Sequence, residues 1–141
     1  MIRTASAVWQ GDLKGGRGSL SAPSGVLNDA PYTFATRFEN RPGTNPEELI
    51  AAAHAGCFSM ALSAELGRAS LTPTRIETTA AVTLETVDGK PTVTRSHLTV
   101  KAKVPGADRA KFLEIASDAK AGCPISRLLR AEITLEATLD D

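Results

Sequence analysis

The sequence predicts an α+β fold in which antiparallel strands are grouped against helices, in one domain spanning residues 1–141. Three observations predict it. Glycine-rich turns cut residues 3–38 into short strand-like pieces, a long Ala-rich apolar segment follows at 46–67, and two segments of alternating apolar and polar residues lie at 76–84 and 98–104. The expected element order is βββαββααβ.

The composition is that of an ordinary soluble domain. Of the 141 residues, 42% are hydrophobic and 23% are charged, and 16 basic residues balance 16 acidic ones. No basic patch of the kind that binds nucleic acid stands out, and no segment has the length of a signal peptide or of a membrane span. We therefore expect a cytoplasmic protein with neither a nucleic-acid nor a membrane partner.

The first strands are expected to form a three-strand meander between turns at Gly11-Asp12, Gly15-Gly16 and Pro23-Ser24-Gly25. In the last of them, residues 32–38, two-residue alternation places the aromatic side chains on one face. Arg37 is then predicted to point away from that aromatic face.

A helix is predicted to begin after Asn45, which is a good N-cap residue followed by Pro46 and, three residues beyond the cap, Glu48. It runs to about Gly67 and is apolar almost all round, which is typical of a central buried helix. Its middle contains His54 and Cys57.

The second half of the chain reads as a hairpin followed by helices and a last strand. Asp88-Gly89 is the predicted hairpin turn, and Asp108 is the predicted cap of an amphipathic helix that ends near Gly122. A further helical turn is expected over 124–130, and a final alternating strand over 133–139.

The two cysteines are the candidate reactive groups. A thiol reacts as the thiolate, which helix N-termini and nearby cations favour. Gly122 and Pro124 predict that Cys123 caps a helical turn, whereas Cys57 lies inside the apolar helix and needs a basic side chain from another element, for which Arg37 is a candidate. The alternative for both cysteines is an inert buried thiol.

His54 lies three residues before Cys57, on the same helix face. It is either a base for that thiol or a hydrogen-bonded core histidine. Together with His97 and Cys123, these residues show none of the paired short spacings of a structural zinc site, so no metal is expected.

Five segments of the chain together resemble one known family. The stretch Gly43-Thr44-Asn45-Pro46-Glu47-Glu48-Leu49-Ile50 leads into Ala-Ala-Ala-His-Ala-Gly-Cys57-Phe-Ser-Met, and Ala121-Gly122-Cys123-Pro124 follows later. These are similar to the two cysteine motifs of the OsmC/Ohr peroxidases. Residues 9–14, 24–27 and 36–39 resemble the OsmC branch, osmotically inducible protein C, more than the Ohr branch.

The resemblance implies a thiol-dependent peroxidase that reduces organic hydroperoxides. It implies Cys57 as the peroxidatic nucleophile, Cys123 as the resolving thiol, and Arg37 with Glu47 as the pair that tunes Cys57. It also implies an intertwined homodimer with antiparallel sheets wrapped around central helices, and reduction by a dithiol such as a lipoylated protein or dihydrolipoamide. No cofactor or metal is implied.

The spacing of Glu47 and Cys57 adds an expectation, because ten residues of straight helix rise by about 15 Å. If both serve one site, either the helix breaks between them or Glu47 comes from the partner subunit.

An alternative function is a redox sensor or a small-molecule-binding protein, in which the same cysteines switch without turnover.

Overall fold

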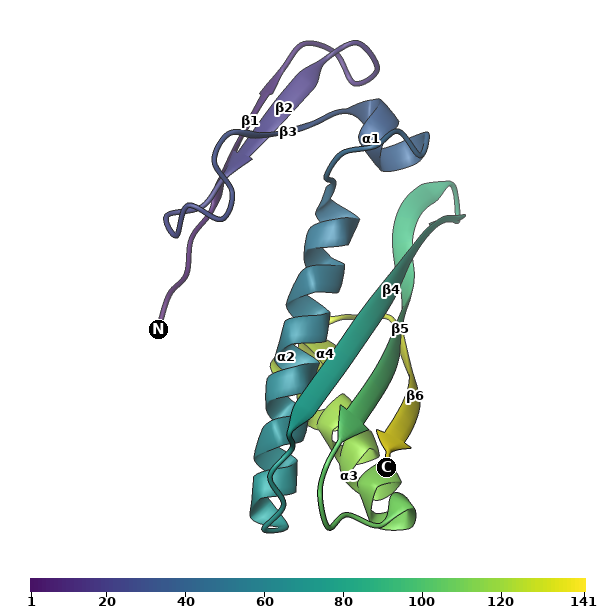
Figure 1. The fold of residues 1–141 in the computed structure, drawn as a ribbon. Coiled ribbons are helices and arrows are strands. Elements are labelled where there is room, and N and C mark those ends of the chain that lie inside the picture. The colour runs from purple at the N-terminus through teal and green to yellow at the C-terminus, as the bar shows by residue number, and fades with distance from the viewer. The chain divides into compact units, whose positions relative to one another are not determined.

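The computed structural model describes residues 1–141, which form two compact units, Met1–Leu49 and Ile50–Asp141 (Figure 1). We call them the N-terminal unit and the C-terminal unit. Each contains its own three-stranded sheet, and helices accompany both sheets. The predicted α+β class is confirmed.

The N-terminal unit contains the predicted antiparallel meander of β1 (Ser6–Gln10), β2 (Arg17–Ser21) and β3 (Ala30–Tyr32). Trp9 and Tyr32 lie with ring centroids 5.5 Å apart. Gly18 lies beneath both rings, and a Cβ atom at this position would collide with each of them. Glycine is therefore required where the two aromatic rings meet.

The strand predicted over residues 32–38 is wrong, because β3 ends at Tyr32 and a short helix follows, α1 (Phe34–Phe38). Thr33 caps this helix: its side chain accepts from the Thr36 amide, and the Thr36 hydroxyl accepts from the Thr33 amide. Phe34 and Phe38 share one helix face at a centroid distance of 4.9 Å. Aromatic residues four apart fit a helix as well as a strand, which explains the error.

Helix α2 (Pro46–Arg68) is continuous over 23 residues and begins where the sequence predicts. Its buried face in the C-terminal unit consists of His54, Phe58, Leu62 and Leu66, spaced four residues apart. The expected burial on all sides is wrong for the single chain, because the opposite face is exposed. That face is composed mostly of small residues: Ala52, Ala53, Gly56, Met60, Ser63, Ala64 and Gly67.

Helix α2 is also the one helix of the chain with the length and apolar composition of a membrane span, with a mean hydropathy of 1.4. The expectation that no segment approaches this composition is wrong. The core helix of a soluble protein satisfies the same criterion, so composition does not separate the two cases.

The C-terminal sheet has the order β4-β5-β6, with β4 (Arg75–Val87) and β5 (Lys90–Lys103) forming the predicted long hairpin. Asp88 and Gly89 both have positive φ angles, 50° and 77°, as a two-residue hairpin turn requires. Strand β6 (Glu132–Asp140) pairs with β5 in parallel, so the expected antiparallel arrangement does not hold for this strand. The helical crossover between β5 and β6 makes parallel pairing possible.

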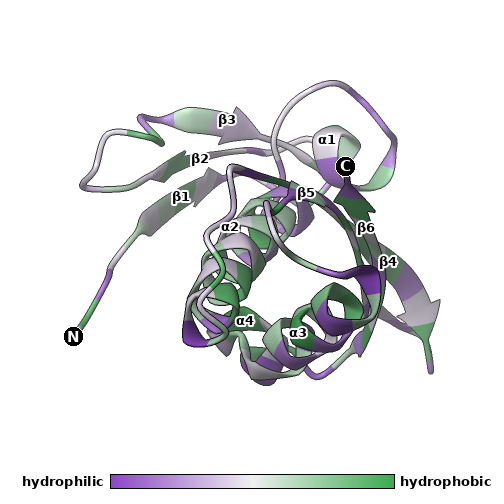
Figure 2. Ribbon diagram, turned by 60° about the horizontal axis from the view of Figure 1, so that its bottom comes forward, coloured by the Kyte–Doolittle hydropathy of each residue, from purple (hydrophilic) through white to green (hydrophobic).

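Two helices form that crossover, α3 (Arg109–Gly122) and α4 (Pro124–Leu128). Asp108 caps α3 as predicted, and α4 ends two residues before the expected Arg130. Helices α2, α3 and α4 lie on one side of the sheet (Figure 1), and α3 turns its hydrophobic surface toward it (Figure 2). The core beneath them consists of Phe58, Leu62, Leu66, Leu98, Val100, Ala102, Val104, Phe112, Ile115, Ala116, Ala119 and Cys123.

Phe112→Ala should destabilise the protein by about 3–5 kcal/mol, because Phe112 is fully buried in this core and its removal leaves a cavity. Leu113→Ala on the same helix is the matched control, since Leu113 is 38% exposed, and it should cost clearly less. Urea unfolding followed by circular dichroism measures both. Equal losses for the two variants would contradict this assignment of the core.

Candidate active site

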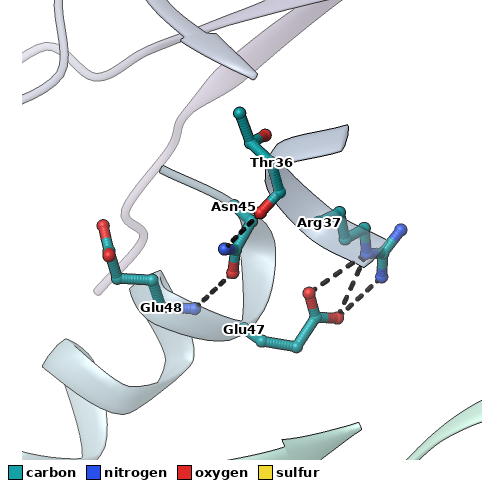
Figure 3. Close-up of polar contacts among 5 residues, drawn as sticks. All are labelled: Thr36, Arg37, Asn45, Glu47 and Glu48. Atoms are coloured by element: carbon teal, nitrogen blue, oxygen red, sulfur yellow. Dashed lines mark hydrogen bonds and ion pairs between the residues drawn. The ribbon is translucent and has the colours of Figure 1, made fainter. Parts of the chain in front are cut away.

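An ion pair joins helix α1 to the start of helix α2 within the N-terminal unit (Figure 3). Arg37 Nη2 donates to Glu47 Oε1 at 2.7 Å, and Arg37 Nε donates to Oε2 at 3.1 Å, so the pairing has two points. The hydrogen bonds from Arg37 to Glu47 raise the pKa of the guanidinium, against the opposing effect of burial. Arg37 is thus a permanent cation whose orientation is fixed by Glu47.

Asn45 holds the two helices of this pair together (Figure 3). Its Oδ1 accepts from the Glu48 amide at 2.9 Å, as expected of the N-cap, and its Nδ2 donates to the Thr36 carbonyl at 3.0 Å. Gly43 has a φ of +142°, and a Cβ there would come within 2.8 Å of the Thr36 methyl group. The loop that positions Arg37 against Glu47 therefore depends on a glycine and an asparagine.

A cavity of about 260 Å³ opens beside Arg37 in the N-terminal unit. Its lining is mostly aromatic: Trp9, Leu13, Tyr32, Thr33, Phe34, Arg37 and Phe38. The Arg37 guanidinium lies 5.2 Å from the centroid of the Phe38 ring. The prediction that Arg37 points away from the aromatic residues is therefore wrong, and the cavity combines an apolar wall with a cation.

Cys57 and Cys123 are both free thiols, and they meet in the C-terminal unit. Cys57 packs against the core cluster that contains Cys123, and both Cys123 and the Ile125 backbone amide lie close enough to influence its pKa. Desolvation raises the pKa of Cys57, as does Cys123 to a smaller degree, and the Ile125 amide opposes the rise. None of the groups that shift the pKa of Cys57 is a cation.

Cys123 occupies the predicted cap position between α3 and α4 and is fully buried. Its sulfur accepts from the Ser126 backbone amide at 3.4 Å and lies 3.2 Å from the Ser126 hydroxyl. The half-buried Cys57 and the buried Cys123 therefore differ in access to solvent, and Cys57 is the more accessible of the two.

His54 hydrogen-bonds to two serines. Its Nδ1 lies 2.6 Å from the Ser96 hydroxyl on β5, and its Nε2 lies 2.8 Å from the Ser126 hydroxyl. Burial lowers the pKa of His54, which favours the neutral imidazole. Of the two interpretations of this residue, the hydrogen-bonded core histidine is confirmed. No group of three or more His, Cys, Asp or Glu side chains is arranged to hold a metal ion.

Comparison with known proteins identifies the family. The sequence profile described as "OsmC-like protein" matches residues 38–138. The chain belongs to the OsmC family. It is 55% identical to Peroxiredoxin OsmC of Escherichia coli (strain K12) over 137 residues, which cover 97% of this chain and 96% of that protein.

More distant relatives of this OsmC-family chain include the organic hydroperoxide resistance protein OhrB of Bacillus subtilis (strain 168), 28% identical over 89% of the chain and 92% of that protein. The crystal structure of OhrB superposes with a TM-score of 0.69 at 26% identity, covering 97% of this chain and 98% of that one. An OsmC-like protein from Mycoplasma pneumoniae, 14% identical, shares the fold with a TM-score of 0.76 and covers 100% of this chain and 99% of that one.

The structure brings the predicted site residues together as two pairs, Arg37 with Glu47 and Cys57 with Cys123. Ser96 and Ser126 are site residues that were not predicted from the sequence. Ser96 lies on the same face of β5 as its buried apolar residues. A hydroxyl on that face predicts a hydrogen-bonding partner in the core.

The stability of the protein should depend on His54 below about pH 6.5, the ordinary pKa of histidine. The pKa of His54 is lowered in the folded state, so the unfolded chain binds the additional proton as the pH falls. The free energy of unfolding therefore decreases with falling pH below about 6.5, and it is recovered as the pH rises.

Urea unfolding of the wild type and of His54→Gln at several pH values between about 5 and 8 measures this contribution. The variant should have a smaller change in unfolding free energy over this range than the wild type. His97→Gln is the control, because His97 is the other histidine of the chain. The same pH dependence in wild type and His54→Gln would contradict the assignment.

Proposed function

We propose that Cys57 and Cys123 carry out the reaction of this OsmC-family chain, with organic hydroperoxides as the substrates. The chain is a thiol-dependent peroxidase: its relatives include Peroxiredoxin OsmC and organic hydroperoxide resistance proteins. The observation that carries the proposal is the pair of free thiols: Cys57 packs against the core cluster that contains Cys123, and Cys123 lies close enough to contribute to the raised pKa of Cys57. Disulfide formation requires such proximity.

The reaction proceeds in three steps. The Cys57 thiolate attacks one oxygen of the O–O bond, the bond breaks, and the other oxygen leaves as alkoxide and is protonated to the alcohol. The resulting sulfenic acid condenses with the Cys123 thiol, which forms the disulfide and releases water. A dithiol reductant then reopens the disulfide by thiol–disulfide exchange and is itself oxidised.

Arg37 is proposed to supply the positive charge that stabilises a thiolate at Cys57. A guanidinium beside the sulfur stabilises the thiolate, and its donors stabilise the charge on the departing oxygen. Glu47 keeps the guanidinium oriented through the two-point pairing.

The charge is proposed to come from a second copy of the chain. Helix α2 has no break between Glu47 and Cys57, so ten residues, or about 15 Å of helical rise, separate them. In a homodimer, the exposed face of α2 would allow another helix to approach closely, because its residues are mostly Ala and Gly. The Arg37–Glu47 pair of one subunit would then serve Cys57 of the other.

The aromatic cavity next to Arg37 is the proposed site for the organic part of the hydroperoxide. Of the side chains that the sequence suggested as apolar lining, Phe34 and Phe38 lie in this cavity. Phe58 is buried in the core and Met60 is 78% exposed, so neither is assigned to the substrate.

A thiol reductant completes the cycle, and we propose a lipoylated protein or dihydrolipoamide for this role. A lipoyl group carries two thiols, so it can attack the disulfide and close on itself without a further partner. The proposed setting is the cytoplasm, as one OsmC-like domain per chain, with no cofactor, metal, nucleic acid or membrane in the reaction.

Cys57→Ser should have no hydroperoxide reductase activity, because the nucleophile is lost. Cys123→Ser should consume one equivalent of an organic hydroperoxide and then stop or become overoxidised at Cys57. Consumption of cumene hydroperoxide with dihydrolipoamide as reductant measures both variants. A wild-type protein that reacts only once with excess reductant would instead be a redox sensor.

Mixing two inactive variants tests the shared site. A heterodimer of Arg37→Met and Cys57→Ser contains one site with Cys57 from the first chain and Arg37 from the second. The two variants are unfolded, mixed and refolded together so that heterodimers form. If the site is shared, each heterodimer should regain about one active site, because one of its two symmetry-related sites has both wild-type residues and the other has neither. If Arg37 serves its own chain, no mixture regains activity. A wild-type protein that is an active monomer in analytical ultracentrifugation also excludes the shared site.

A further inference from the structure

A chain of hydrogen bonds leads from the sheet to the sulfur of Cys123 within the C-terminal unit. Ser96 Oγ lies 2.6 Å from His54 Nδ1, His54 Nε2 lies 2.8 Å from Ser126 Oγ, and Ser126 Oγ lies 3.2 Å from Cys123 Sγ. Three separate elements contribute: β5 carries Ser96, α2 carries His54, and α4 carries Ser126. This series of hydrogen bonds ends at the Cys123 sulfur and does not include Cys57.

These polar groups occupy positions where apolar residues would be expected. Ser96 and His54 are completely buried, Ser96 in the row of Leu98 and Val100, and His54 in the row of Phe58. Burying a hydroxyl and an imidazole is unfavourable unless each is hydrogen-bonded, and here every buried side-chain polar atom has a partner. The network is therefore complete, and it connects the core to a reacting sulfur.

The positions of the protons in this series of hydrogen bonds depend on one another. A neutral imidazole has one donor and one acceptor nitrogen, and the Ser126 hydroxyl has a single proton to donate. If the Cys123 thiol donates to Ser126, then Ser126 donates to Nε2, and Nδ1–H donates to Ser96. If the sulfur instead accepts from Ser126, Nε2–H must donate to Ser126. The tautomer of His54 thus follows the state of the sulfur.

We propose that Ser126 and His54 form a proton relay that activates Cys123 for attack on the oxidised Cys57. The proposal rests on the resolving role of Cys123 given above. Ser126 is the catalytic residue of the relay, because it touches the reacting sulfur. His54 acts through Ser126 and is a positioning residue, and Ser96 holds the imidazole in place through its hydrogen bond to Nδ1.

Protons and electrons balance in this step. The Cys123 thiol gives its proton to Ser126 Oγ, and Ser126 passes its own proton to Nε2 of His54. The sulfur electron pair of Cys123 forms the S–S bond to Cys57, and the S–O bond of the sulfenic acid breaks. The departing hydroxide takes a proton from solvent and the imidazolium releases one to solvent, so that water is the only by-product. During reduction the relay runs in reverse and reprotonates the Cys123 thiolate.

Single-turnover kinetics separates the relay from the first chemical step. One equivalent of cumene hydroperoxide is mixed with reduced protein; Cys57 sulfenic acid is trapped with a dimedone reagent, and the disulfide is followed by mass spectrometry. In Ser126→Ala, oxidation of Cys57 should remain within about twofold of wild type, while disulfide formation slows by about a hundredfold, in the range of general base catalysis. With excess hydroperoxide, Cys57 should accumulate as sulfinic acid.

Two further variants distinguish proton transfer from a structural role. Ser126→Thr keeps the hydroxyl and should recover most of the rate of disulfide formation. Ser59→Ala is the control, because Ser59 lies on the same helix as His54 but bonds to Thr78 and the Ala55 carbonyl. It should form the disulfide at the wild-type rate. Failure of Ser126→Thr to recover the rate would overturn the relay.

Nitrogen NMR of ¹⁵N-histidine-labelled, reduced wild-type protein provides a readout that does not depend on the folding of a Ser126 variant. His54 should be neutral, with the proton on Nδ1 and none on Nε2, and a His97→Gln sample assigns the signals. A reduced protein with the proton on Nε2, or a Ser126→Ala protein with normal disulfide formation, would overturn the relay. If wild-type Cys57 is not oxidised at all, the proposed function fails instead.

Discussion

Helix α2 determines where most of the chemical groups of this protein lie, because the period of an α-helix fixes which side chains share a face. His54 and Phe58 follow each other on the buried face, and Cys57 lies beside them at its edge. Glu47, in the first turn of the same helix, binds Arg37. Within the C-terminal unit, a rotation of this helix would therefore move thiol and imidazole together, and the packing of its apolar face sets their positions.

The protein separates its polar groups by charge. Arg37 and Glu47 form a charged pair that keeps partial access to water, with 36% and 11% of their side chains exposed. The groups in the core, Ser96 and His54, are uncharged. This distribution follows the cost of desolvation, which is several kcal/mol for an ion and less for a neutral group that is hydrogen-bonded. The charged pair is thus kept near the surface of its unit, and the polar groups of the core are neutral and hydrogen-bonded.

The alternating hairpin and the start of helix α2 could be predicted from local pattern, because Asp88-Gly89 and Asn45-Pro46 act over a few residues. The helix at 34–38 could not be predicted, because the spacing of its aromatic residues fits both the two-residue period of a strand and the 3.6-residue period of a helix. The parallel pairing of β6 depends on the crossover rather than on the strand itself. In the candidate site, the family motifs led to both cysteines. The hydrogen bond between Ser126 and His54 joins residues 72 positions apart, and no local pattern predicts such a contact.

Ser96 also constrains how the sheet can assemble. Side chains alternate along a strand, so a slip of β5 by one residue would turn Ser96 and its apolar row outward and bring Arg95 and His97 beneath helix α2. His54 would then face a cation or a second imidazole in place of a hydroxyl. The buried row that contains Ser96 therefore makes a one-residue misalignment of the hairpin unfavourable.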